Sequence, residues 1–391
     1  MPGPVNTGNT AFLLISAALV FLMTPGLALF YAGLVVKGKD VREITLQVLL
    51  SVSVVAIIWA LFGFSLVFGN DVAGVIGDLS LGGLNAVGRQ PSPSFAPTVP
   101  FLAYFSYEVM FAIITPALIT GAFADRLDFG RYLLFLIGFS IFIYLPVAHW
   151  VWGGGFLERL GVLDFAGGIV VHGTAGTAAL TAAILARKSR AQAQERPPSR
   201  STESVIAVAL GASLLWFGWF GFNAGSAFAA DGVAATAFAN TLIAPSLALI
   251  TWAVIDWSKR HEVDLVSTMT GAVAGLATIT PAAGYVAPWG AAIIGAVGGI
   301  VTYLAVQFRK ARGWDDALDV WGVHGVGGLS GAILVGFLAV AAVNQASGLV
   351  EGNARQLAVQ AAAVAIAAAY SFVVALAILA IIGRAWRARQ R

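Results

Sequence analysis

The sequence predicts an all-α integral membrane protein that crosses the bilayer eleven times, as an inverted repeat of two five-helix halves followed by one C-terminal helix. Its composition, its long apolar segments and the positions of its basic residues predict this class. Hydrophobic residues make up 59% of the 391 residues and charged residues only 10%, whereas a soluble domain carries about 25% charged residues. With a mean hydropathy of +0.87, the chain has too few charges to cover a water-exposed surface.

Apolar segments follow one another along the chain, each close to the length of about 20 residues that a helix needs to cross a bilayer. They comprise residues 10–34, 44–68, 100–122, 132–152, 168–187, 204–223, 234–257, 265–282, 289–308, 320–341 and 356–383. The first segment is too long for the core of a signal peptide, so we expect it to be retained as a span. The fifth and tenth are the least apolar, because each is rich in glycine and contains a histidine.

The basic residues indicate the orientation. All 22 lysine and arginine residues except Arg89, Arg159 and Arg355 fall on every second loop or in the C-terminal tail. Because loops on the cytoplasmic side carry the excess of basic residues, we expect the N-terminus outside and the C-terminus inside. This alternation also requires an odd number of spans.

The chain is predicted to be one membrane domain, residues 1–391, in which a polar cytoplasmic linker, residues 187–203, separates two halves. The halves comprise residues 10–187 and 204–341, and the eleventh span, residues 356–383, follows them. Because each half has an odd number of spans, the halves must have opposite orientations. Transporters often place the substrate path at the interface of such inverted repeats, near the middle of the membrane.

Each half carries the tripeptide Val-His-Gly near the start of its last span, with His172 in the first half and His324 in the second. An aspartate precedes each histidine, Asp164 by eight residues and Asp319 by five. Titratable side chains within spans usually line a path or a site, and matched positions in two halves favour one shared site over two unrelated packing contacts. A pair of neutral imidazoles would form a narrow passage that suits a small neutral hydrogen-bonding molecule.

Aromatic residues and one hydroxyl mark the outer end of the sixth span, where "LLWFGWFGFNAGSA" contains Trp219, Phe222 and Ser226. An aromatic face with a hydroxyl beside it can hold a partly desolvated cation, with about 2 kcal/mol of attraction. Phe111 of the third span adds a further ring. Glu108 lies three residues before Phe111 on the same helical face, and a carboxylate there must face water or a cavity rather than lipid.

Other aromatic and titratable residues have simpler expected places. Trp150 and Trp216 are typical of the aromatic belt at the membrane interface. We expect His149 to be packed near the outer end of the fourth span, and His261 to be solvated in a loop.

Several long motifs, in this order along the chain, are shared with one family. They are "FYAGLV", "FGFSLVFG", "HWVWGGG", "GVLDFAGGIVVH", "WFGWFGFNAGSA", "ITPAAGYV" and "DVWGVHGVGG". On these motifs the chain resembles the ammonium transporters of the Amt/Mep/Rh family, from about residue 10 to residue 383. The resemblance implies a homotrimer in the inner (cytoplasmic) membrane, with one pore per subunit, no cofactor, and ammonium or ammonia as the substrate. Methylammonium fits as an analogue by its shape.

The resemblance also implies the roles of individual residues. The family's outer recruitment site would fall on Trp152 and Ser226, and its stacked phenylalanine gate on Phe111 and Phe222. Glu108 stands where the resemblance leads us to expect glutamine, which would alter affinity in the vestibule.

Deeper in the membrane, the family's twin pore histidines would be His172 and His324. Its buried aspartate would be Asp164, with a structural and electrostatic role rather than contact with the substrate. A mechanism of selection follows, because ammonium can release a proton and potassium, of similar size and charge, cannot. Desolvation before an apolar pore lowers the pKa of an amine, so that neutral ammonia could pass the histidines.

Alternatives to transport remain open from the sequence. The chain ends with "IIGRAWRARQR" and without the family's usual cytoplasmic tail motif, which leaves a PII protein partner open and raises an ammonium sensor module as a second hypothesis. The intact histidine pair favours transport. A channel for a neutral gas or water is the third hypothesis, but it would not need a cation site at Trp152.

No enzyme hypothesis competes with these three. The sequence contains no cysteine, which excludes thiolate metal sites and a cysteine nucleophile. No metal-binding cluster or nucleotide loop is visible, and the glycine-rich "WGGGF" lacks the strand-to-helix context of a phosphate cradle.

Overall fold

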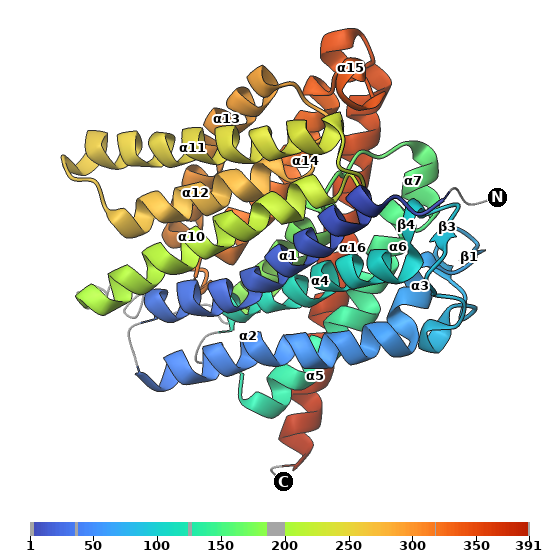
Figure 1. Cartoon of the computed structure of the whole chain (residues 1–391). Helices are drawn as coiled ribbons and strands as arrows, with labels where there is room; N and C mark the ends of the chain where they lie inside the picture. The colour runs from blue at the N-terminus through green and yellow to red at the C-terminus, as the bar shows by residue number, and fades with distance from the viewer. Residues whose placement is uncertain (1–3, 36–37, 124–126, 186–199, 317, 390–391) are drawn as a thin grey trace.

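The computed structural model describes residues 4–35, 38–123, 127–185, 200–316 and 318–389, and these residues are largely helical (Figure 1). The exceptions lie mainly between the second and third long helices. There β1 (Asp71–Val72) pairs with β2 (Ile76–Gly77), and β3 (Pro91–Ser92) pairs with β4 (Ala96–Pro100), both antiparallel. The prediction of an all-helical membrane protein therefore agrees with the structure, apart from these two small hairpins.

The first half consists of five consecutive long helical segments, three of them interrupted by or beginning with a π-helical turn. They are α1 (Thr7–Leu34), α2 (Gly38–Ile58) continuing through η1 (Trp59–Gly63) into α3 (Phe64–Phe68), α4 (Phe101–Ile119), α5 (Phe129–Phe139) continuing through η4 (Ser140–Tyr144) into α6 (Leu145–Trp152), and η5 (Gly168–Gly173) continuing into α8 (Thr174–Leu185).

The described part of the second half also consists of successive helices, and a long helix follows it. The segments are α10 (Thr202–Gly225), α11 (Gly232–Arg260), α12 (Leu265–Ile279), α13 (Pro288–Arg312), η6 (Trp321–Gly325) continuing into α14 (Val326–Leu338), and α16 (Ala354–Arg389). Short helices lie in the connections: η2 (Gly82–Leu84), η3 (Thr120–Ala122), α7 (Phe156–Leu160), α15 (Ala341–Asn344) and η7 (Leu349–Glu351).

Among the described residues, 10 helices are long and apolar enough to cross a membrane, and the shorter apolar helix Leu265–Ile279 lies at the predicted eighth span. The chain is thus a multi-pass membrane protein by these criteria. The fourth long segment extends further than predicted, because α7 follows α6 almost directly and the candidate span covers Phe129–Leu160. The predicted linker 187–203 lies mostly outside the described residues.

Side-chain caps explain where several helices begin. The Asn6 side chain accepts a hydrogen bond from the Asn9 amide at the start of α1, and Asp231 accepts from the Val233 and Ala234 amides at the start of α11. Asp264 caps α12 in the same way. These side chains satisfy backbone donors that have no partner within the helix.

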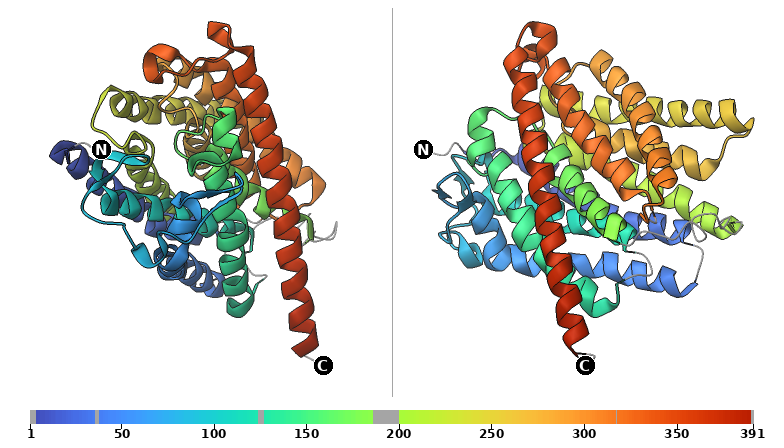
Figure 2. Two further views of the ribbon diagram at one scale, coloured as in Figure 1. Left: turned by 90° about the vertical axis from the view of Figure 1, so that its right-hand side faces the viewer. Right: turned by 180° about the vertical axis from the view of Figure 1, so that it is seen from behind.

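The two halves are in intimate contact. The first helix of each half, α1 and α10, lie along one another over much of their length (Figure 1). The third helix of each half packs against the first two, with α4 on α1 and α2, and α12 on α10 and α11. Figure 2 shows α16 as a long helix that runs obliquely across both halves, and it contacts α5 and α8 of one half and α14 of the other.

Candidate functional site

The two predicted histidines meet in the interior. Nδ1 of His172 lies 3.3 Å from Nδ1 of His324, and the imidazole centroids are 5.3 Å apart with an interplanar angle of 20°. Both side chains are buried, with exposed fractions of 1% and 3%. In a neutral pair, one Nδ1 must carry the proton and the other must accept it, so the contact fixes opposite tautomers on the two rings.

Both histidines lie on π-helical turns that open their helices, His172 on η5 and His324 on η6. π turns are rare in proteins overall, and many of those that occur lie at functional sites. The sequence analysis identified the histidines but not these turns, because nothing in apolar periodicity distinguishes a π turn from an α turn.

Asp164 holds the start of η5. Its carboxylate accepts hydrogen bonds from four consecutive backbone amides, those of Gly167, Gly168, Ile169 and Val170, over 2.5–3.2 Å. A carboxylate at a helix N-terminus satisfies donors that otherwise have no partner and interacts favourably with the helix dipole. Asp164 therefore positions the turn that carries His172.

The counterpart of Asp164 in the second half is Asp316, which the sequence analysis missed. Asp316 is fully buried, and its Oδ2 accepts from the Trp321 amide at 2.7 Å, at the start of η6. It precedes His324 by eight residues, the same spacing as between Asp164 and His172. That shared spacing was the available signal. Burial raises the pKa of the Asp316 carboxyl to about 6, against the opposing influence of Arg309.

Asp319, the aspartate chosen from the sequence, has a different place. Its Oδ1 lies 2.7 Å from Nη2 of Arg309, and its backbone is left-handed, with φ of 57°. Arg309 also donates from Nη1 to the Asp316 carbonyl oxygen at 2.7 Å. Asp319 thus contributes to an ion pair that holds the segment before η6 and does not cap the turn itself.

Two glycines allow the histidine turns to approach each other. Gly176 and Gly328 each lie four residues after a histidine. A Cβ at Gly176 would collide with the backbone of Gly325, and one at Gly328 would collide with the Gly168 carbonyl oxygen and the His172 Cβ. Each histidine helix therefore packs against the other half's π turn, as the contacts of α8 with η6 and of α14 with η5 also show.

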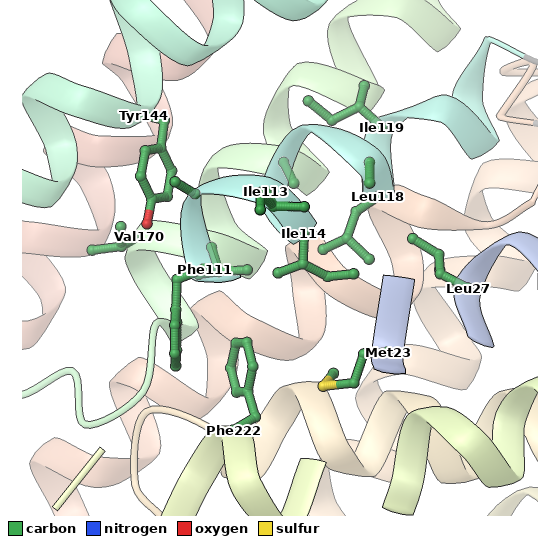
Figure 3. Packing of buried hydrophobic residues seen from close by; sticks show 14 of the residues in the cluster. Met23, Leu27, Phe111, Ile113, Ile114, Leu118, Ile119, Tyr144, Val170 and Phe222 are labelled. Atoms are coloured by element: carbon green, nitrogen blue, oxygen red, sulfur yellow. The ribbon is translucent and has the colours of Figure 1, made fainter. Parts of the chain in front are cut away.

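A stack of aromatic rings leads to His172. The Phe111 and Phe222 rings lie 4.2 Å apart between centroids, at 25° to one another (Figure 3). The Phe222 centroid is 6.0 Å from that of His172, and the Trp219 ring stacks on His172 at 5.2 Å. Trp219 is itself fixed by a hydrogen bond from Nε1 to Thr280 Oγ1 of 2.8 Å. Both phenylalanine side chains are buried, with exposed fractions of 2% and 0%.

A cavity of about 420 Å³ lies on the other side of Phe111, and predicted residues of the first and second halves line it together. Trp152 meets Phe111 edge to face at 6.1 Å, and its Nε1 donates to the Asp164 carbonyl oxygen at 2.9 Å. Ser226 Oγ lies 3.0 Å from the Phe222 carbonyl oxygen and 3.2 Å from the hydroxyl of Tyr107. Tyr107 was not predicted, although it lies four residues before Phe111.

Glu108 also lines this cavity, and its side chain is buried at 5% exposure. Its Oε2 has no hydrogen-bond partner among the described residues. The carboxylate therefore faces the cavity rather than the lipid, as the sequence analysis required.

The other two histidines lie away from the pair. His149 is buried, with Nδ1 donating to the Val67 carbonyl oxygen at 2.6 Å and Nε2 lying 2.8 Å from Asp71 Oδ1. The contacts of Asp71 with His149 and Arg159 hold the pKa of the Asp71 carboxyl below its usual range. His261 is exposed just after α11, as predicted. His149 is packed as expected, and its contact with Asp71 connects α6 to the β1–β2 hairpin.

Gln360 of α16 fastens the segment that contains Asp164, which the sequence analysis did not foresee. Its Oε1 accepts from the Leu163 amide at 2.7 Å, and its Nε2 donates to the carbonyl oxygens of Leu163 and Ala332, both at 2.8 Å. Gln356, one turn earlier, donates to the Gly161 carbonyl oxygen at 2.9 Å. One buried amide thus joins α16, the second-half helix α14 and the backbone beside Asp164.

Replacing Gln360 with leucine is expected to lower the thermal unfolding midpoint in detergent more than the matched change Gln356→Leu does. The Gln360 variant leaves two buried backbone groups, the amide and the carbonyl oxygen of Leu163, without partners, and each costs about 1–3 kcal/mol. The Gln356 variant leaves one such group, the Gly161 carbonyl oxygen. Differential scanning fluorimetry compares the two. Equal shifts would contradict the assigned role of Gln360.

Comparison with known proteins agrees with this geometry. The model of the Ammonium Transporter Family matches residues 11–389. The chain belongs to this family. An ammonium transporter of Bacillus subtilis is 43% identical over 97% of this chain and 92% of its own length. That relative is named as a transport protein rather than an enzyme.

Solved structures give the same result for this ammonium transporter family member. The crystal structure of Candida albicans Mep2 matches with a TM-score of 0.90 and 34% identity, over 97% of this chain and 85% of that chain. A structure described as a sensor Amt protein matches with a TM-score of 0.86 and 28% identity, over 96% of this chain and 93% of that chain. The fold is therefore compatible with both names, and the higher identity is to proteins named as transporters.

Proposed function

We propose that this protein transports ammonium across the membrane by capturing the ammonium ion in the cavity, removing a proton, and passing neutral ammonia along the histidine pair. The observation that carries the proposal is an unbroken series of groups from cavity to pore. Phe111 lines the cavity, Phe222 stacks on Phe111, and the His172 and His324 rings follow. Each group suits one step of the transfer.

Capture takes place beside Trp152 and Ser226. The indole face attracts a cation through its quadrupole, and the serine hydroxyl can accept an N–H hydrogen bond. Potassium has no hydrogen to donate, so the hydroxyl contributes to recognition of ammonium by its geometry. Trp152 is held in place by its bond to the Asp164 carbonyl oxygen.

The phenylalanine pair excludes hydrated ions. Phe111 and Phe222 are buried and in contact, so passage requires the rings to move and the substrate to shed its water. A charged ion loses far more solvation energy than neutral ammonia in such surroundings. The proton therefore parts from the nitrogen on the cavity side of the rings and crosses to the other side separately from the ammonia, so that each transported ammonium moves one charge and transport gives a current.

The histidine pair receives the neutral molecule. With opposite tautomers, one ring presents a bare Nε2 and the other an Nε2–H. Ammonia has three donors and one acceptor, so it can bond to both kinds of nitrogen in turn. Nε2 of His172 is buried and has no protein partner among the described residues, which leaves it available to the substrate.

The proposed architecture has eleven spans, with the N-terminus outside, the C-terminus inside, and two inverted halves, residues 10–187 and 204–341, in a single domain. The matched order of long helices, the paired π turns and the equal Asp–His spacing support it. Assembly as a homotrimer in the inner membrane rests on family membership alone, and a PII partner has no support from the described residues.

A sensor function is the weaker alternative, because proteins named as ammonium transporters are more similar to this chain than the sensor structure is. A channel for a neutral gas alone does not account for a cavity lined by Trp152 and carboxylates.

Uptake of radiolabelled methylammonium into proteoliposomes tests the proposal. We expect saturable uptake that excess ammonium blocks and that the same concentration of potassium inhibits only weakly, because the cation site attracts both ions but only ammonium donates hydrogen bonds. Uptake no greater than that of protein-free liposomes would contradict transport.

Replacing Trp152 with leucine is expected to raise the half-saturating ammonium concentration about tenfold, which corresponds to about 1.4 kcal/mol of lost cation attraction. Trp289→Leu is the matched control, because Trp289 is the second residue of α13 and half of its surface is exposed. Initial rates over a range of ammonium concentrations measure the effect. An unchanged half-saturating concentration in the Trp152 variant would count against the cation site.

A further inference from the structure

Glu108 differs from every other acidic residue of the cavity in how its oxygens are used. Four carboxylates line the cavity, from Glu108, Glu158, Asp164 and Asp231. Glu158 accepts from the Gly154 amide at 2.6 Å, and Asp231 accepts from the amides that begin α11. Asp164 serves the η5 turn. Of these four acids, only Glu108 has a buried carboxylate oxygen, Oε2, that lacks a hydrogen-bond partner among the described residues.

The described residues that line the cavity include no lysine, arginine or histidine, so none of them supplies a positive charge to this carboxylate. The titratable groups on its own helix are Tyr104 and Tyr107, and Tyr107 is already bonded to the Phe222 carbonyl oxygen at 2.6 Å. Tyr144 of η4 approaches from the neighbouring span, with a buried hydroxyl that has no partner among the described residues. A phenol and a carboxylate cannot neutralise one another's charge.

Tyr285 reaches the same cavity from the connection between α12 and α13, and the remaining acids there are Glu158, Asp164 and Asp231. The surroundings of Glu108 therefore supply negative charges and hydroxyl groups, but no positive charge. A buried carboxylate in such a place is costly unless a cation or a proton joins it. The cavity is the open side from which that cation can come.

We propose that Glu108 is the anionic ligand of the ammonium ion in the cavity and sets the affinity of capture. This inference rests on the proposed function, because it names the counter-charge for the same substrate at the same site. Glu108 is positioned for it three residues before Phe111, so that a cation bound to the carboxylate lies at the entrance of the ring pair. Ammonium supplies the positive charge and the N–H donors that the protein does not.

A carboxylate binds a cation only in its ionised form, so ammonium capture strengthens as pH rises. This holds over the range well below the pKa of ammonium, where the substrate itself stays protonated. A glutamine in the same place would bind ammonium through its carbonyl oxygen alone, more weakly and without this dependence on pH.

Three variants test the assignment: Glu108→Gln, Glu108→Asp and Asp231→Asn. The last neutralises another acid of the cavity, and asparagine caps a helix about as well as aspartate. The experiment measures ammonium-induced currents of proteoliposomes on a supported membrane. The pH is varied from about 6 to about 8, because buried carboxylates can gain or lose their proton in this range. Potassium is added as a competitor.

We expect Glu108→Gln to raise the half-saturating ammonium concentration about tenfold, to leave the maximal current within about twofold, and to lose the pH dependence and the competition by potassium. Glu108→Asp should keep both dependences, and Asp231→Asn should behave as the original protein. The proposal is overturned if the glutamine and aspartate variants behave alike, or if Glu108→Gln keeps the original affinity and pH dependence. Absence of current from the original protein would contradict the proposed transport instead. Ammonium-dependent thermal stabilisation of the same variants would then test Glu108 separately, with a weaker shift expected for Glu108→Gln.

Discussion

Replacing His172 and His324 together with leucine is expected to reduce the ammonium current at least about tenfold. The substitution removes two buried hydrogen-bonding partners from the path, each with a net contribution of about 0.5–1.5 kcal/mol to a molecule that contacts it, and leaves an apolar constriction of similar volume. The initial current per amount of reconstituted protein measures the loss. Because both rings are buried and mutually bonded, we expect discrimination against potassium to change as well.

The control for this experiment is His261→Leu, since His261 is exposed beyond α11. We expect the double variant to fold, because leucine at these positions leaves no charged group unpaired. A thermal unfolding midpoint close to that of the original protein would show that the fold is retained. A double variant with the original current and selectivity would show that the histidine pair is not in the substrate path.

Asp164→Asn is expected to cause a large loss of stability. Asparagine has one acceptor oxygen where the carboxylate has two. Its side-chain NH2 group would therefore face two of the four backbone N–H groups that Asp164 now binds, and it cannot accept their hydrogen bonds. Each buried donor left without a partner costs about 1–3 kcal/mol. We therefore expect a loss of about 3 kcal/mol or more, seen as a lower unfolding midpoint in detergent and as little folded protein in the membrane.

Asp264→Asn provides the matched comparison, because Asp264 caps α12 and asparagine is an equally good cap. Its midpoint should stay close to that of the original protein. Shifts of the same size in both variants would refute the view that the four-fold hydrogen bonding of Asp164 distinguishes it from an ordinary helix cap.

Much of the arrangement could be predicted from the sequence, because apolar length, charge bias and a repeated tripeptide are properties of the chain itself. The expectation that His172 and His324 approach one another followed from Val-His-Gly in two halves of opposite orientation, and in the structure their Nδ1 atoms are 3.3 Å apart. Phe111, Phe222, Trp152 and Ser226 were named from the resemblance, and the structure brings them to one cavity and one ring pair.

Two other features were missed. For Asp316 the sequence held a signal, its spacing of eight residues before His324, equal to that of Asp164 before His172, whereas for Gln360 it held none. Asp319 was chosen as the second aspartate for its proximity to His324, yet Asp316 makes the hydrogen bond to the turn. Gln360 lies in a helix that was predicted only as an appended span, and its bonds reach Leu163 nearly 200 residues earlier in the chain. No local sequence pattern distinguishes a glutamine whose side chain will hydrogen-bond to backbone groups far away in the chain.

The central claim is that ammonium turns over through this protein rather than only binding to it. Currents on a supported membrane, recorded after an ammonium pulse at two lipid-to-protein ratios, test it most directly. Turnover fills the vesicles faster when more protein is present, so we expect the current to decay faster at high protein density, and an equal pulse of potassium to give almost none. A brief charge displacement whose decay is the same at both densities would contradict transport and indicate binding alone.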